Sequence, residues 1–180
     1  MSLRKAIIHS QFGLVLLTCL SAYSQLTYER KLDWSVPEKV NARFKAADIW
    51  KNYDVSDALN PFYLRGDFDG DGVPDYAVLV VNKKTGKSGI AVVNGAKKRV
   101  DVVGASGASV WCGPKKHGYP FDDFDWVDFW QVHRKIKLDP DEFNQLPGSM
   151  RGEAIDVETE SAGGLIYWDG SRYRCFITGD

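Results

Sequence analysis

The chain has 180 residues, of which 44% are apolar and 13% aromatic, and this composition excludes an intrinsically disordered protein. Its formal net charge of −1 provides no basic footprint and argues against a nucleic-acid partner. A chain of this length predicts one domain around a single hydrophobic core.

The first 24 residues have the pattern of a signal peptide. Arg4 and Lys5 form a cationic start, residues 12–20 are mostly apolar, and residues 22–24 read Ala-Tyr-Ser, a small-x-small cleavage site. The apolar stretch is far shorter than the ~20 residues that a membrane span requires. The pattern predicts export to the periplasm or the medium.

Cleavage after Ser24 leaves residues 25–180 as a single extracytoplasmic domain with 21 basic and 24 acidic residues, a charge of 21 − 24 = −3. No later stretch is apolar enough to cross a membrane. Cys19 offers an alternative, a lipoprotein, but Thr18 stands where a lipobox has a smaller residue, so simple cleavage is the preferred interpretation.

The domain is predicted to begin with a helix. Ser35 and Glu38 have the spacing of a capping box. One apolar face of the helix is formed by Val36, Val40, Phe44 and Ala47. We expect this helix to end near Tyr53 and to serve as core packing.

Residues 66–75 read Gly-Asp-Phe-Asp-Gly-Asp-Gly-Val-Pro-Asp and lead into the apolar run 76–81. Counted from Asp67, carboxylates stand at positions one, three, five and nine, with a glycine at six, and this is the oxygen-ligand spacing of a calcium loop. Position twelve is Val78 where an EF-hand has glutamate, so the loop is expected to enter a strand. The predicted ligands are Asp67, Asp69, Asp71, the carbonyl of Val73, and Asp75.

Over residues 66–80 the chain resembles the calcium loop of FG-GAP and VCBS repeats, which occur in integrin-type propellers and bacterial surface proteins. The resemblance implies that Asp67, Asp69, Asp71 and Asp75 ligate calcium. The sequence contains one copy of this loop, whereas a propeller is built from several blades.

From residue 62 onward the pattern is that of successive strands with short connections, at 62–65, 76–81, 89–93, 99–103, 153–158, 163–168 and 172–178. Asp169-Gly170 marks a hairpin between the last two. The fold class predicted is α+β, with the N-terminal helix packed on a mainly antiparallel sheet of about six or seven strands.

Signal-peptide cleavage would remove Cys19 and leave Cys112 and Cys175 as an even pair in an oxidising compartment. A disulfide between them is therefore predicted, with buried free thiols as the alternative. Cys112 lies in the irregular segment 104–120, together with Trp111 and His117.

Residues 121–132 interleave five aromatic side chains with Asp122, Asp123, Asp125 and Asp128. Aromatics packed in the core with acids facing water are the favoured interpretation. A carboxylate pair of a glycosidase is the alternative.

These patterns favour an exported calcium-binding domain, a structural or interaction module for an unidentified protein or cell-envelope partner. Two alternatives stay open: a small exported hydrolase that uses the Asp122–Asp128 cluster, and a secreted inhibitor or immunity-type protein that binds through 104–120. A non-enzymatic role is preferred, because no spacing identifies a catalytic constellation.

The export prediction can be tested by intact-mass measurement of protein recovered from the producing cell. The expected product begins at Gln25, because cleavage follows the small-x-small site. A chain that still begins at Met1, or one diacylated on Cys19, would contradict it.

Overall fold

The computed structural model describes residues 36–112, 119–134 and 149–177. The predicted signal peptide, Ser35 and His117 lie outside these ranges. From Lys39 onward, the described residues belong to one compact unit. Its described helices include none that is long and apolar enough to cross a membrane.

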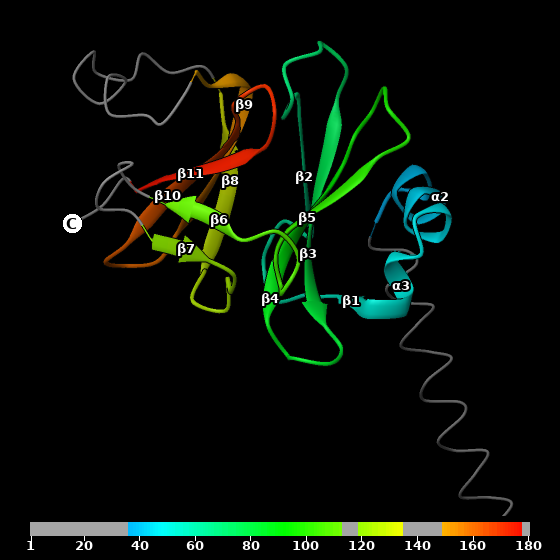
Figure 1. The fold of residues 1–180 in the computed structure, drawn as a ribbon, viewed down its shortest axis with the longest axis horizontal. Helices are drawn as coiled ribbons and strands as arrows, with labels where there is room; N and C mark the ends of the chain where they lie inside the picture. The colour runs from blue at the N-terminus through cyan, green and yellow to red at the C-terminus, as the bar shows by residue number, and fades with distance from the viewer. Residues whose placement is uncertain (1–35, 113–118, 135–148, 178–180) are drawn as a thin grey trace, which may run out of the picture. The chain divides into compact units, whose positions relative to one another are not determined.

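Sheet A is organised around the strand that follows the acidic loop (Figure 1). This strand, β3 (Asp75–Asn82), pairs with β4 (Ser88–Val93), which pairs with β5 (Val100–Gly104). The other edge of β3 is shared by β1 (Tyr53–Val55) and β2 (Tyr63–Gly66). All of these pairings are antiparallel.

Sheet B has six strands in the order β7-β6-β11-β10-β9-β8. Its pairings are antiparallel except for β11 beside β6, which is parallel. The strands are β6 (Val110–Cys112), β7 (Tyr119–Phe121), β8 (Phe129–His133), β9 (Arg151–Glu158), β10 (Gly163–Trp168) and β11 (Tyr173–Ile177).

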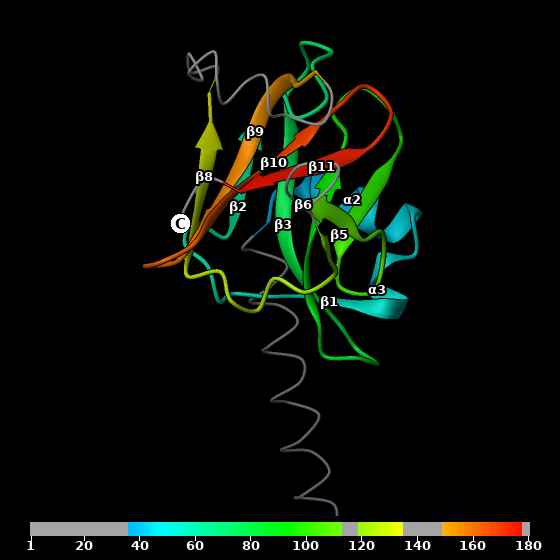
Figure 2. The same ribbon diagram turned by 60° about the vertical axis from the view of Figure 1, so that its left-hand side comes forward.

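Both faces of β3 are buried, which accounts for its uninterrupted apolar sequence. Ala77 and Leu79 belong to a core cluster shared with Ile155 of sheet B. Val78 and Val80 point to the opposite face of sheet A and are also buried, at 0% and 1% exposure. Figures 1 and 2 show sheet A between sheet B and the helices.

The predicted α+β class, one helix on one sheet, is wrong. The described chain is mostly β and forms two sheets. The positions of β2–β5 and β9–β11 agree with the strands predicted from the sequence. The division of the strands into two sheets was not predicted. The chain leaves sheet A at Gly104, Ala105 and Ser106, whose φ angles are all positive, at 75°, 50° and 61°. Consecutive left-handed residues turn the backbone sharply, so β6 begins a new sheet.

The helical part is also shorter than the sequence predicted. Helix α2 (Glu38–Ala46) buries Val40 and Phe44, as the apolar stripe indicates. It ends before Asp48, which has a left-handed φ of 54° and precedes the four-residue helix α3 (Ile49–Asn52). Tyr53, the expected helix end, is already the first residue of β1.

Cys112 and Cys175 are joined by a disulfide, and they are direct partners in the parallel pairing of β6 with β11. The bond therefore ties the short strand β6 to the middle of sheet B. Both cysteines are buried, at 1% and 4% exposure.

Removal of this bond should lower stability, because the cross-link closes a loop with a sequence separation of 63. A loop of that length predicts a loss of about 4 kcal/mol in the free energy of unfolding on the chain-entropy estimate. The measurement is denaturant unfolding of the oxidised protein against the Cys112→Ala/Cys175→Ala variant. Equal unfolding free energies, or two free thiols in the denatured, non-reduced parent, would contradict it.

Candidate metal centre

The acidic loop, residues 67–74, connects the antiparallel strands β2 and β3, and the pair Gly66–Asp75 closes it. Gly70 and Gly72 have φ angles of 75° and 85°, a conformation that glycine adopts without strain. A Cβ on Gly70 would also lie 2.8 Å from the backbone nitrogen of Gly152 in β9. The glycines therefore allow the loop both to turn and to pack against sheet B.

The first carboxylate, Asp67, shapes the loop from within. Its Oδ1 accepts hydrogen bonds from the backbone N–H groups of Gly70 and Asp71, at 2.8 and 3.1 Å. Its Oδ2 accepts from the N–H of Gly72 at 3.0 Å. Side-chain to backbone bonds of this kind are why aspartate is favoured in turns.

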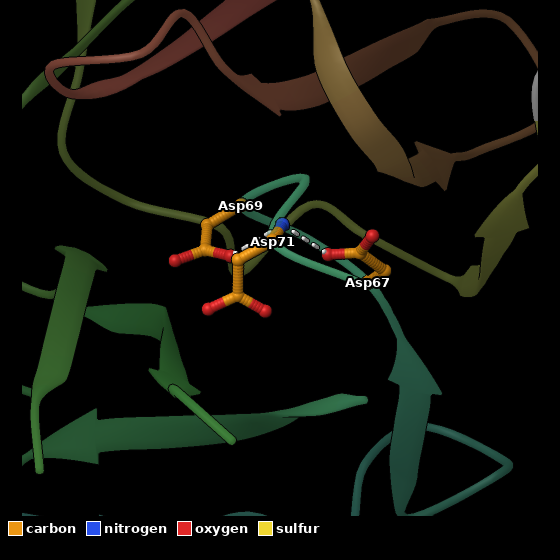
Figure 3. A group of neighbouring side chains, drawn as sticks. All are labelled: Asp67, Asp69 and Asp71. Carbon is orange, nitrogen blue, oxygen red and sulfur yellow. Dashed lines mark hydrogen bonds between the residues drawn. The ribbon is translucent and has the colours of Figure 1, made fainter. Parts of the chain in front are cut away.

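Asp67, Asp69 and Asp71 are neighbours in the loop, and the Asp71 N–H donates hydrogen bonds to the other two carboxylates (Figure 3). One donor oxygen from each lies within 4.8 Å of the others. This cluster could hold a metal ion. In the described parts of the chain, no other group of three His, Cys, Asp or Glu side chains meets that spacing.

The side chain of Asp69 is fully buried, and two residues of the β4–β5 turn contact its Oδ2. The Lys97 ammonium lies 2.7 Å away and the Asn94 amide donates a hydrogen bond at 2.5 Å. Burial acts to raise the pKa of Asp69, but the hydrogen bond and charge of Lys97 outweigh it and hold that pKa below its ordinary value. Asp69 is thus ionised and already paired with a cation.

Asp75, the fourth predicted carboxylate ligand, is not part of the Asp67, Asp69 and Asp71 cluster. It is fully buried, and its two oxygens accept hydrogen bonds from the backbone N–H of Phe68, at 2.9 Å, and of Gly95, at 2.7 Å. Burial raises the pKa of Asp75 to about 6, helped by the charges of Asp69 and Asp71. Asp75 therefore joins the loop to the β4–β5 turn.

Val73, whose carbonyl is a predicted ligand, directly precedes Pro74 in the loop. Its backbone N–H donates to Oδ1 of Asp71 at 2.9 Å, and its side chain is 37% exposed. Asp71 Oδ2 lies 3.9 Å from the Lys97 ammonium.

Three residues that contact the acidic loop were not predicted from the sequence. They are Asn94 and Lys97 from the β4–β5 turn, and Glu153 from β9. Glu153 Oε2 accepts the backbone N–H of Asp67 at 2.8 Å, and the Glu153 N–H donates to the Asp67 carbonyl at 2.7 Å. A polar depression of about 410 Å³ adjoins this contact and is lined by Asp67, Gly70, Arg134, Gly152 and Glu153. No local sequence pattern predicts that these residues contact the loop, because they come from other strands and turns.

The other predicted cluster, Asp122 to Asp128, lies in the connection between β7 and β8 and forms separate contacts. Asp122 pairs with Lys87 at 2.6 Å, and Asp123 accepts the N–H of Ser88 at 2.9 Å. Asp128 accepts a hydrogen bond from Thr159. These carboxylates hold the connection to β4 and to the end of β9. Cys112 carries no free thiol, because it is bonded to Cys175.

No family model, no curated protein and no solved structure matches this chain. The resemblance of residues 66–80 to FG-GAP and VCBS loops therefore stays a prediction from the motif.

In metal-free protein, the carboxyl group of Asp75 should titrate with a pKa of about 6, whereas an exposed aspartate titrates near about 3.9. The folded state then binds this proton more tightly than the unfolded state. The free energy of unfolding should consequently fall as pH rises from about 4 to 6, by on the order of 3 kcal/mol for this group.

The measurement is carboxyl-carbon NMR titration in chelator, combined with denaturant unfolding at each pH. Asp75→Asn cannot titrate, so it should lose this part of the pH dependence. An Asp75 midpoint near the exposed value, about 3.9, would contradict the assignment.

Proposed function

We propose that this protein is an exported calcium-binding domain that acts as a structural or interaction module outside the cytoplasm. The observation that carries the proposal is the convergence of Asp67, Asp69 and Asp71 within 4.8 Å of one another. The calcium-loop spacing of the sequence supports the same ion, since it brings carboxylates to alternate positions.

The chemistry of the donor set favours calcium among common metal ions. Asp67, Asp69 and Asp71 provide only oxygen donors, which suit hard cations and not zinc. Calcium accepts six to eight oxygens in flexible geometry, whereas magnesium needs a tighter octahedron and keeps its waters. The remaining positions would be filled by the Val73 carbonyl and by water, since both oxygens of Asp75 already accept backbone N–H groups.

Calcium at this place would act on the loop and on its neighbours together. The loop contacts the β4–β5 turn through Asp75 and sheet B through Glu153. An ion that fixes the loop would therefore reinforce the contact between the two sheets. We expect an affinity of about 10⁻⁴–10⁻³ M, the range of extracellular calcium modules.

The partner of the module is proposed to be a protein or another component of the cell envelope. Export to the periplasm or the medium rests on the first 24 residues. The disulfide Cys112–Cys175 is compatible with such an oxidising compartment.

Calcium should raise the melting temperature of the parent protein relative to chelator. At about 100 times the dissociation constant, mass action adds roughly 2.7 kcal/mol to the free energy of unfolding. Asp71→Asn should lose most of this gain, because it removes one charged ligand while keeping the side-chain shape. A tenfold weaker affinity would already cost about 1.4 kcal/mol of binding free energy.

The matched control is Asp57→Asn, since Asp57 is exposed and lies outside the loop. It removes the same charge and should keep the full calcium effect. Identical melting of the parent in chelator and in calcium, with no heat of binding by calorimetry, would refute the proposal.

A further inference from the structure

We infer that the ammonium group of Lys97 is a tethered cation that occupies the metal centre when no metal is bound and must leave when calcium binds. The inference rests on the proposed function, because it concerns the same site. It adds a residue that controls the calcium affinity. It also adds a metal-free state of the site, in which the ammonium of that residue is the cation.

The ammonium lies beside two of the three carboxylates of the cluster, Asp69 and Asp71. Lys97 Nζ lies 2.7 Å from Oδ2 of Asp69 and 3.9 Å from Oδ2 of Asp71. A calcium ion would bind these carboxylates at about 2.3–2.6 Å. Both cations would then share the same oxygens only a few ångströms apart, where like charges repel strongly in a partly buried setting.

The backbone of the turn can stay in place while the ammonium leaves. Asn94 is 2% exposed, and its side chain donates to Asp69 Oδ2 and accepts the backbone N–H of Lys97. Gly95 is held by Asp75 at 2.7 Å. By contrast, the side chain of Lys97 is 54% exposed, so its flexible stem can carry the charge into water.

This arrangement explains how a loop with three close carboxylates can fold without a metal. Lys97 offsets the charge of Asp69, whose side chain has no access to water. The same contact lowers the apparent calcium affinity, because the ion must displace the ammonium. Since coupling between two sites is reciprocal, calcium must weaken the Lys97–Asp69 contact by the factor by which that contact weakens calcium binding.

The first experiment compares calcium binding by calorimetry in the parent, Lys97→Met and Lys98→Met. Lys98 is exposed in the same turn and provides the matched control for net charge. Lys97→Met should bind calcium about tenfold more tightly than the parent, a typical coupling factor. Lys98→Met should stay within about twofold, because its charge is screened by water. In chelator, Lys97→Met should melt at a lower temperature than the parent.

The second measurement uses the unmodified protein. Amine acylation followed by peptide mass mapping should show Lys97 protected relative to Lys98 in chelator, and similarly reactive in saturating calcium. This readout does not depend on the folding of any variant.

Tighter binding by Lys97→Met together with calcium-dependent exposure of its amine supports the inference. Equal affinity in the parent and Lys97→Met, or weaker affinity in the variant, overturns the inference and leaves the metal centre standing. No binding by either protein overturns the proposed function as well. Binding by Lys97→Met alone supports the displacement by Lys97 and overturns calcium binding by the parent.

Discussion

The rest of the site depends on the two hydrogen bonds that the buried carboxylate of Asp75 accepts. Its oxygens accept backbone N–H groups from Phe68, in the acidic loop, and from Gly95, in the β4–β5 turn. This pair of hydrogen bonds places the loop carboxylates beside Asn94 and Lys97. A buried group that bonds two segments at once fixes their separation more firmly than surface contacts can.

The opposite pKa directions of Asp69 and Asp75 show where positive charge acts in this site. Both carboxylates are buried, yet the pKa of Asp69 is lowered while burial raises that of Asp75 to about 6. Burial raises the pKa of Asp75 more strongly, and the charges of Asp69 and Asp71 add to it, whereas the contact with Lys97 lowers the pKa of Asp69. The acidic cluster is thus built around a positive charge at Asp69, which Lys97 supplies in this structure.

The local part of this arrangement could be predicted from the sequence, and the long-range part could not. The acidic spacing identified the loop and the apolar run identified β3, because both signals lie within a few neighbouring residues. Asn94, Lys97 and Glu153 reach the loop across 25, 28 and 86 residues, and no local pattern encodes such contacts. The division into two sheets was missed because it follows from positive φ angles at Ala105 and Ser106, residues that rarely adopt them.

Calcium binding at this loop is tested most directly by a crystal structure grown in calcium, with anomalous scattering used to locate the ion. The expected map has one calcium peak within about 2.3–2.6 Å of carboxylate oxygens from Asp67, Asp69 and Asp71, with the Lys97 side chain turned toward solvent. A map with no peak at this loop at saturating calcium, and with Lys97 still bonded to Asp69, would contradict it.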